Sequence, residues 1–429
     1  MQKILQWKLT ILAQLYLWKY KPMIIGVTGN AGKTSAKEII GAVVGRIKKV
    51  RIAAGNLNNE LGLPLTIIGG WDDEYYTKGP SILFWAKVLS SGCLALFKPQ
   101  DYPEVLILEY GADQPGDIRR LAQKFKPHIS VITIVGDVPV HVEFFKEADA
   151  VADEKANLVK VLSMSDFAVL NHDDRRVMEM KSKTKARVLT YGFGQGATIR
   201  ASDVEYTSNE EGRPVGVTFK LNEGSHFAPV RIEGSLGKSQ AWSSAAAAAV
   251  GSILGMNLVD ISEAISSHHG PKGRLKILQG IKNSNIIDDT YNASPASTRL
   301  ALETLRDVPA LRKIAVLGDM LELGEHSEKA HRDIGIFANE TSDILVCVGL
   351  QAKFIAASAS GKLLPDKIFI FNNSNEAKLK VKELIREHDL ILVKGSQGMR
   401  MEKIVEEIMA DPSHKKDLLV RQSKKWLSK

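Results

Sequence analysis

The sequence predicts an α/β protein: a doubly wound, mostly parallel sheet with a small antiparallel annex, followed by a Rossmann-like α/β domain. Short apolar runs alternate with helical stretches over residues 23–160 and again from 284 onward, as parallel strands joined by crossover helices do. Five short strands expected within 165–235 form the annex. With 429 residues, 44% hydrophobic and 25% charged, a wholly disordered, collagen-like or coiled-coil chain is excluded. We expect three parts: 1–22, 23–275 and 276–429.

The first 22 residues predict an amphipathic helix. Its large apolar residues recur three or four positions apart: Ile4, Trp7, Ile11, Leu15 and Trp18. Lys8 interrupts the apolar run and no small-residue cleavage site follows, which argues against a signal peptide. Two interpretations stay open. The helix packs on the domain that follows, or it lies in a membrane interface with tryptophan and lysine at headgroup level. The stretches 81–98 and 415–429 have a similar composition and add weight to the second interpretation.

Residues 23–45 read as a strand, a glycine turn and a helix, which is the context of a phosphate-binding loop. Backbone N–H groups at such a helix N-terminus cradle phosphate oxygens. Lys33 is expected to reach the β- and γ-phosphates, and the Thr34 hydroxyl to bind Mg²⁺. The leading glycine is Gly26 rather than residue 27, so the spacing is a variant of the common motif. The nucleotide-binding residues predicted here are Thr28, Gly29, Asn30, Ala31, Gly32, Lys33 and Thr34.

Five further segments follow in order along the chain: NLNNELGLPLTI (56–67), LILEYGADQPGDI (106–118), IIDDTYNASPAS (286–297), VLGDMLELGEHSEKAH (316–331) and LVKGSQGMRMEKIVE (392–406). Together with the loop TGNAGKT, they resemble the Mur ligase family, and within it the MurF-type enzymes. The resemblance runs from Ile24 to Ile408. It implies an ATP-dependent ligase of peptidoglycan-precursor synthesis. Such an enzyme joins D-alanyl-D-alanine to a muramoyl-tripeptide carboxylate through an acyl phosphate, with ATP and two Mg²⁺ ions.

The resemblance also assigns roles in the N-terminal half. Glu109, which ends an apolar strand, and His141 are implied as metal ligands beside Thr34. Lys155 matches a family lysine that CO₂ converts to a carbamate, an anion able to share the metal. An exposed helical lysine is the alternative for Lys155, because its neighbours depart from the family pattern. Lys33, His141 and Lys155 are the implied catalytic residues.

In the C-terminal half, the resemblance implies nucleotide contacts and a substrate site. The nucleotide contacts are Arg274, Asp289, Tyr291 and Asn292. Asp288 or Asp289 is alternatively a cap for the helix that begins near Pro295. The site for the incoming dipeptide is implied at Asp319, Lys394, Ser396 and Arg400, for which strand-end capping and surface pairing are the alternative.

Two departures from the family pattern matter. Gln240 stands where the family's adenine-contacting asparagine is expected, so it would substitute with a longer amide. The family's N-terminal domain, which grips the UDP-sugar, is not expected here, because about two dozen residues precede the phosphate loop. A lipid-linked acceptor, a different amino-acid substrate, and a partner-dependent or non-catalytic protein therefore stay open as alternatives.

Charge and cysteine content complete the expectations. The net charge of +8 suits anionic substrates or a negative membrane face, and no clustered basic-aromatic motif suggests nucleic acid. Two cysteines fit a reducing cytoplasm. No apolar run is long enough to cross a membrane. We expect a cytoplasmic monomer, with peripheral contact to the inner membrane face as a hypothesis.

Overall fold

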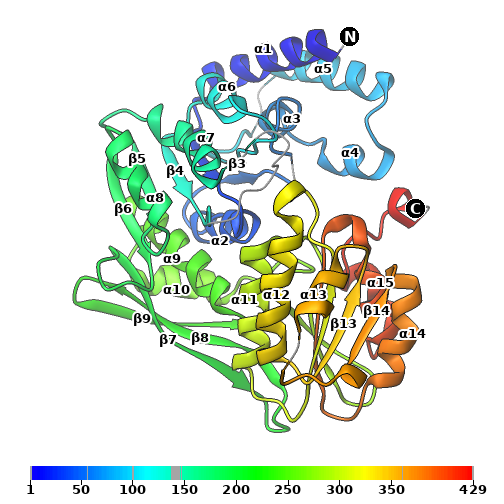
Figure 1. The fold of residues 1–429 in the computed structure, drawn as a ribbon. Coiled ribbons are helices and arrows are strands. Elements are labelled where there is room, and N and C mark those ends of the chain that lie inside the picture. The colour runs from blue at the N-terminus through cyan, green and yellow to red at the C-terminus, as the bar shows by residue number, and fades with distance from the viewer. Residues whose placement is uncertain are drawn as a thin grey trace.

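The computed structural model describes residues 2–55, 57–98, 101–136, 145, 147–359 and 361–427, without the side chains of 424 and 425. Two sheets organise these residues (Figure 1). The first has nine strands in the order β2-β3-β1-β4-β5-β6-β7-β8-β9. Its strands are β1 (Met23–Thr28), β2 (Val50–Ile52), β3 (Val105–Glu109), β4 (Ile129–Ile132), β5 (Phe167–Asn171), β6 (Arg187–Gly192), β7 (Ile199–Ser208), β8 (Pro214–Glu223) and β9 (His226–Glu233).

The annex is smaller than the sequence predicts. All pairs from β2 to β7 are parallel, and only β7–β8 and β8–β9 are antiparallel. The first two strands expected in the annex, β5 and β6, therefore extend the parallel sheet. The reason is the connection between them: α8 (Arg175–Glu179) crosses over between β5 and β6, whereas short turns join the last three strands as hairpins.

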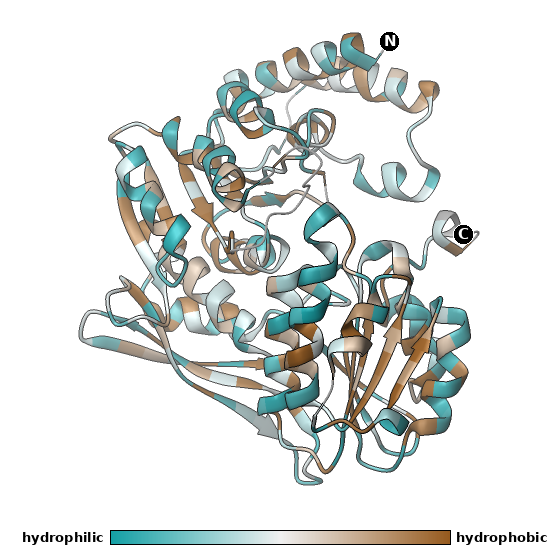
Figure 2. Ribbon diagram, viewed as in Figure 1, coloured by the Kyte–Doolittle hydropathy of each residue, from teal (hydrophilic) through white to brown (hydrophobic). Residues whose placement is uncertain are grey.

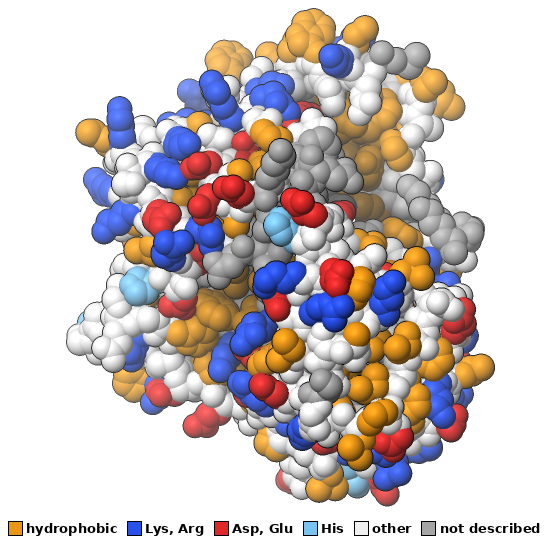
Figure 3. All heavy atoms as spheres, viewed as in Figure 1, with side chains coloured by type: hydrophobic (Ala, Val, Ile, Leu, Met, Phe, Trp, Pro, Cys, Tyr) orange, Lys and Arg blue, Asp and Glu red, His pale blue; other side chains and the backbone are white. Residues whose placement is uncertain are grey.

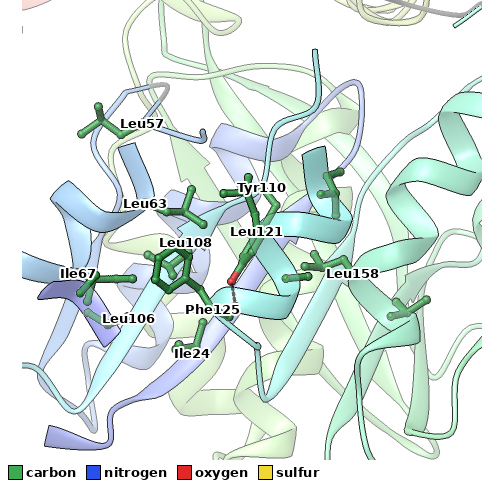
Figure 4. Close-up of a cluster of buried hydrophobic side chains, with 14 of the residues drawn as sticks. Ile24, Leu57, Leu63, Ile67, Leu106, Leu108, Tyr110, Leu121, Phe125 and Leu158 are labelled. Atoms are coloured by element: carbon green, nitrogen blue, oxygen red, sulfur yellow. Dashed lines mark hydrogen bonds between the residues drawn. The ribbon is translucent and has the colours of Figure 1, made fainter. Parts of the chain in front are cut away.

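Helices cover both faces of this sheet. One face carries α2 (Lys33–Val44), α9 (Lys238–Ile253) and α10 (Leu258–Ser266). The other carries α1 (Gln2–Tyr20), α3 (Gly62–Ile68), α5 (Ile82–Leu96), α6 (Asp117–Lys124) and α7 (Ala148–Lys160). Figure 4 shows the hydrophobic core between the sheet and this second group of helices. In this core, Ile24, Leu106 and Leu108 of the strands contact Leu63 of α3 and Phe125 at the end of α6. The alternating strands and helices seen in the sequence are thus confirmed as a doubly wound layer.

The second sheet has six strands in the order β10-β11-β15-β12-β13-β14, parallel except for β10–β11. Its apolar strands lie between helices whose outer faces are hydrophilic (Figure 2). Its strands are β10 (Lys276–Gln279), β11 (Asn285–Asp289), β12 (Lys313–Gly318), β13 (Ile344–Val348), β14 (Ile368–Phe371) and β15 (Leu390–Lys394). Its helices are α11 (Pro295–Asp307), α12 (Ser327–Thr341), α13 (Ala352–Ser358), α14 (Ser374–Leu384) and α15 (Glu402–Ile408). The remaining short helices are α4 (Asp72–Lys78), α16 (Lys415–Leu418) and α17 (Lys424–Leu427).

The N-terminal helix is present but packs through a face the sequence did not single out. Its buried residues are Leu9, Thr10, Leu12, Ala13 and Tyr16. The interpretation that this helix packs on the domain that follows is therefore confirmed, but the stripe from Ile4 to Trp18 faces outward. The helix carries apolar residues on two opposite faces, and spacing alone does not say which face the protein covers.

Candidate active site

The turn between β1 and α2 has the geometry of a phosphate-binding loop. A side chain at Gly29 would lie 1.9 Å from Thr133 Oγ1, so only glycine fits there. Gly32 has φ of 83° and stands directly before α2, in a conformation that favours glycine. The Asn30 N–H donates to the Ile134 carbonyl at 2.6 Å, which fixes the loop against the strand end. Gly32 has no side chain that could cap α2, which suits an anion at the N-terminus of this helix.

Three side chains of α2 place charge and a hydroxyl at this turn. Lys33 folds back onto the loop, with Nζ 2.7 Å from the Gly29 carbonyl. Burial lowers the pKa of Lys33, and Glu109 partly offsets that effect. Thr34 Oγ1 accepts a hydrogen bond of 2.8 Å from Arg274. Lys37 lies one turn further along the same face of α2 and is fully buried.

Glu109 ends β3 beside the loop and is 3% exposed. Its Oε2 lies 3.2 Å from Lys37 Nζ, and Asn58 donates to Oε1 at 3.3 Å. Burial opposes ionisation of Glu109, but Lys37, Lys33 and Arg274 outweigh it and hold the pKa below the usual value. Lys37 was not predicted from the sequence. Its signal was its position four residues after Lys33, on the helix that presents the loop.

Lys155 lies on α7 and reaches the same cleft. It is 5% exposed, which contradicts the alternative of an exposed helical lysine. Burial, reinforced by nearby Lys33, lowers the pKa of Lys155 to about 7, while Glu154 and Glu109 act against that shift. The carboxylate of Glu154 turns away from the cleft and accepts the Gly116 and Ile118 N–H groups at the start of α6. Lys155 therefore presents a largely desolvated amine to the cleft.

Arg274 connects the phosphate loop to the second sheet. Its guanidinium donates to Thr34 and lies 4.2 Å from the centre of the Tyr291 ring. Its Nε is buried without a hydrogen-bond partner among the described residues. One arginine thus touches both walls of the cleft and keeps a donor available.

The loop after β11 is held by two buried cations. Lys394 donates to Asp289 Oδ2 at 2.6 Å and to the Asn292 carbonyl at 2.9 Å. Arg421 donates to the Tyr291 carbonyl at 2.6 Å and to Glu402 at 3.0 Å. Arg421 was not predicted, and no motif marks it. Its role follows from the C-terminal segment folding back onto this loop.

The dipeptide residues implied by the resemblance do not all reach the cleft. Lys394 and Ser396 line it. Asp319 accepts the Gln351 and Ala352 N–H groups at 3.0 and 2.7 Å, where it caps the start of α13. Arg400 pairs with Glu402 at 2.6 Å and stacks on Trp426. Neither Asp319 nor Arg400 lines the cleft, and the Arg400–Glu402 pair is buried rather than the surface pair of the alternative.

Two other sequence expectations have different outcomes. The cap of the helix at Pro295 is Ser294, in a capping box with Ser297, so the alternative that Asp288 or Asp289 caps it is wrong. Asp288 is instead fully buried and accepts the Thr290 hydroxyl at 2.6 Å. The predicted metal ligand His141 lies outside the described residues.

One cleft of about 440 Å³ lies between the units built on the two sheets, and it is bordered by the phosphate loop, Glu109, Lys155, Arg274, the loop after β11, Lys394 and Ser396. Besides the residues above, Asn171, Tyr191, Gln240 and Trp242 line it. Trp242 donates to Asp173 at 2.7 Å and packs edge-on against Phe193. Gln240 is buried at the start of α9, beside this aromatic wall. The cleft thus joins a phosphate cradle to a flat-walled, partly apolar end, as a nucleotide site requires.

Comparison with known proteins agrees with this geometry. A model of the Mur ligase middle domain matches residues 92–251, and a model of the Mur ligase, glutamate ligase domain matches 273–397. The UDP-N-acetylmuramoyl-tripeptide–D-alanyl-D-alanine ligase of Rickettsia prowazekii is 30% identical over 391 residues, 90% of this chain and 78% of that protein. The Bacillus subtilis ligase of the same name is 29% identical, over 94% of this chain and 79% of that protein. The crystal structure of the MurF ligase of Thermotoga maritima with ADP superposes with a TM-score of 0.76 at 25% identity, covering 93% of this chain and 82% of that one.

A phosphate loop facing a second Rossmann-like sheet across a nucleotide-sized cleft defines, with these likenesses, an ATP-dependent ligase. The chain belongs to the Mur ligase family. The similar proteins and structures named above are MurF-type members, and the chain is a ligase of peptidoglycan-precursor synthesis.

Proposed function

We propose that this chain joins D-alanyl-D-alanine to the free carboxylate of a muramoyl-tripeptide, at the expense of ATP. The observation that carries the proposal is the make-up of the cleft. The phosphate loop, Glu109 and Lys155 stand on one wall, and the loop held by Lys394 stands on the other, with Arg274 between them. The first wall suits phosphoryl transfer, and the second suits the arrival of a second substrate.

The first step transfers the γ-phosphoryl group of ATP to the tripeptide carboxylate. A carboxylate oxygen forms a bond to the γ-phosphorus, the bond to the β-bridging oxygen breaks, and ADP leaves. Backbone N–H groups at Gly29–Gly32 and the Lys33 ammonium would hold the phosphates there. Arg274, whose Nε is unpartnered, would donate to an equatorial phosphate oxygen. An amine then attacks the acyl carbon and phosphate leaves, so that an amide forms.

The oxygen atoms at the loop fit Mg²⁺. Glu109 Oε2 is buried beside Lys37 Nζ, which lies 3.2 Å away as its ion-pair partner, and Thr34 offers its hydroxyl on the adjoining helix. No cluster of three His, Cys, Asp or Glu side chains occurs in the described part of the chain. A site of one carboxylate and one hydroxyl, completed by nucleotide phosphates and water, is how Mg²⁺ is commonly held. Bound there, the ion would neutralise charge on the transferring oxygens. His141 is proposed for the second ion.

Lys155 is proposed to carry the carbamate. Its neutral amine adds to CO₂ with formation of an N–C bond and loss of one proton, which turns a cation into an anion. The pKa of about 7 supports this, because much of the amine is neutral near pH 7. The 5% exposure also supports it, because a buried cation next to Lys33 is unfavourable, whereas an anion there is stabilised.

We also propose the domain boundaries, the location, the oligomeric state and the dipeptide-binding residues of the chain. We divide the chain at 22/23 and 275/276, the second boundary lying one residue after Arg274. Both cysteines are free thiols, which suits the cytoplasm, where ATP is available. Both cleft walls come from one chain, so a monomer suffices. Lys394 and Ser396 are the residues proposed to meet the dipeptide, since they line the cleft.

The test is turnover by the purified full-length chain. Phosphate release from ATP is measured with D-alanyl-D-alanine and UDP-linked muramoyl-tripeptide, and the product is identified by mass spectrometry. We expect phosphate release that depends on both substrates and a product heavier by one dipeptide residue mass. Release with other amino acids but not with the dipeptide would overturn the substrate assignment. Absence of release with either the UDP-linked or the lipid-linked acceptor would overturn the proposed reaction.

A further inference from the structure

The apolar stripe of α1 and the adjoining helix α5 form an exposed surface that the described residues of the chain do not cover. We define this surface, the α1/α5 face, by nine large apolar side chains: Ile4, Trp7, Ile11, Leu15, Trp18, Ile82, Leu83, Leu94 and Phe97. Trp7 is 62% exposed, Trp18 77% and Phe97 88%. Figure 3 shows hydrophobic side chains gathered at this end of the molecule. Soluble monomers rarely expose contiguous apolar patches of this kind without a binding role.

Contacts between α1 and its neighbours fix the position of the two helices, so the α1/α5 face is a defined part of the folded structure. Tyr16 of α1 donates to the Gly92 carbonyl of α5 at 2.9 Å. Leu12 packs onto Gly92, where a side chain would come within 2.9 Å of it. Tyr20 stacks on Tyr102 with 4.3 Å between ring centres. Because one face of α1 is committed to these contacts, the opposite face is held toward solvent.

The charge pattern of the face indicates its partner. Neither α1 nor α5 contains an aspartate or glutamate, while Lys3, Lys8 and Lys19 lie on α1; Lys87 of α5 pairs with Glu74 of α4 at 2.7 Å. At 100° per residue, Lys3 falls on one side of the α1 stripe and Lys8 on the other. Lysines flanking an apolar stripe with tryptophans suit a bilayer interface, where the stripe enters the acyl boundary and the amines meet lipid phosphates. No described helix is long and apolar enough to cross a membrane, so contact would be peripheral.

We propose that the α1/α5 face binds the surface of an anionic phospholipid bilayer. The third stretch suggested by the sequence does not take part in the same way. Trp426 of that stretch lies 5.3 Å from Arg400 and 5.9 Å from Arg421, within the C-terminal unit. The bilayer surface is therefore formed by α1 and α5.

Helix α1 also borders a cavity next to the cleft, through residues on the side away from its apolar stripe. Gln2 and Gln6 of α1 line a polar cavity of about 230 Å³, and four residues of that cavity also line the cleft: Asn58, Asn59, Gly111 and Asp113. A bilayer against the stripe would lie about one helix diameter from this end of the cleft. Given the proposed function, which this step rests on, an acceptor on a lipid carrier would enter there.

Vesicle co-sedimentation tests the proposal. The full chain is mixed with vesicles of phosphatidylcholine, alone or with phosphatidylglycerol. We expect binding to the mixed vesicles, much weaker binding to phosphatidylcholine alone, and release by high salt. The double variant Trp7→Gln/Trp18→Gln should bind at least about tenfold more weakly, because two large apolar side chains no longer enter the interface.

A matched control removes two equally exposed apolar side chains elsewhere. Val259 and Leu379 are 60% and 63% exposed, and Val259→Gln/Leu379→Gln should bind vesicles as the unmodified chain does. Equal loss in both double variants, or no binding by the unmodified chain, would overturn the proposal. A mass that doubles with concentration in light scattering, and does so only when Trp7 and Trp18 are intact, would assign the face to a second copy and also overturn it.

Activity separates this proposal from the proposed function. With the UDP-linked acceptor, turnover by Trp7→Gln/Trp18→Gln should match that of the unmodified chain, because neither tryptophan lines the cleft. Turnover without vesicle binding would leave the function standing and remove the membrane face. Vesicle binding without turnover would support the membrane-binding face and overturn the proposed function. Turnover of a lipid-linked acceptor in mixed vesicles should fall at least about tenfold in the double variant, as binding does.

Discussion

The buried ion pair between Lys394 and Asp289 gives the sharpest prediction for the second wall of the cleft. Lys394 is 2% exposed, and its amine bonds both Asp289 and the Asn292 carbonyl. In Lys394→Met the methionine fills a similar volume but leaves the Asp289 carboxylate buried without its counter-charge. Breaking a buried pair in this way costs about 3–5 kcal/mol. We therefore expect the free energy of unfolding to fall by about that amount at neutral pH.

Urea unfolding followed by circular dichroism measures this loss, and a surface pair provides the control. Lys329 and Asp333 are 2.8 Å apart but 80% and 55% exposed, so Lys329→Met should change stability by less than about 1 kcal/mol. Adding Asp289→Asn to Lys394→Met should recover much of the loss, since the uncompensated charge is then gone. Equal effects of Lys394→Met and Lys329→Met would refute the idea that burial makes the first pair important.

Three further predictions concern titration and charge at the site. Lys155→Ala should abolish phosphate release, whereas turnover equal to that of the unmodified chain would remove Lys155 from the mechanism. Burial raises the pKa of Asp288 from 3.8 to about 7, so the native carboxyl keeps a proton that the unfolded chain loses between those values. The free energy of unfolding should then fall as the pH rises from about 4 to about 7. Near pH 8, Asp288→Asn should be more stable than the unmodified chain by up to about 4 kcal/mol, and near pH 4 the two should be equally stable. Urea unfolding at both pH values measures this difference. Lys37→Met should destabilise the chain, because the Glu109 carboxylate loses its ion-pair partner. In thermal melts, added Mg²⁺ should raise the stability of this variant more than that of the unmodified chain. Equal effects of Mg²⁺ on the two proteins would argue against a metal site at Glu109.

Much of the candidate site could be predicted from the sequence, because short local motifs mark it. A glycine turn between a strand and a helix fixes its own geometry, so the phosphate loop could be placed from residues 23–45 alone. Glu109 was predictable for a related reason, since the carboxyl end of a strand next to the loop strand presents side chains to the same edge. Lys155 followed from the family resemblance, and the structure adds its burial.

Other features depended on long-range packing, which a single sequence does not show. Arg421 reaches the Tyr291 loop only because the C-terminal segment folds back across 130 residues of chain. Asp319 stands in a family motif, yet its carboxylate caps α13, because that helix starts directly opposite it. The covered face of α1 could not be chosen either. Both faces are apolar, and the choice depends on where Gly92 of α5 offers a flat surface.

Oxygen-18 labelling of the acceptor carboxylate tests the proposed acyl-phosphate intermediate most directly. Muramoyl-tripeptide labelled with ¹⁸O in its free carboxylate is turned over with ATP and D-alanyl-D-alanine, and the released phosphate is analysed by mass spectrometry. If the carboxylate attacks the γ-phosphorus in the cleft of Lys33 and Arg274, the acyl carbon–oxygen bond breaks when the amine arrives. One ¹⁸O atom then appears in each phosphate. Unlabelled phosphate, or label in AMP, would contradict an acyl phosphate and with it the roles given to the phosphate loop.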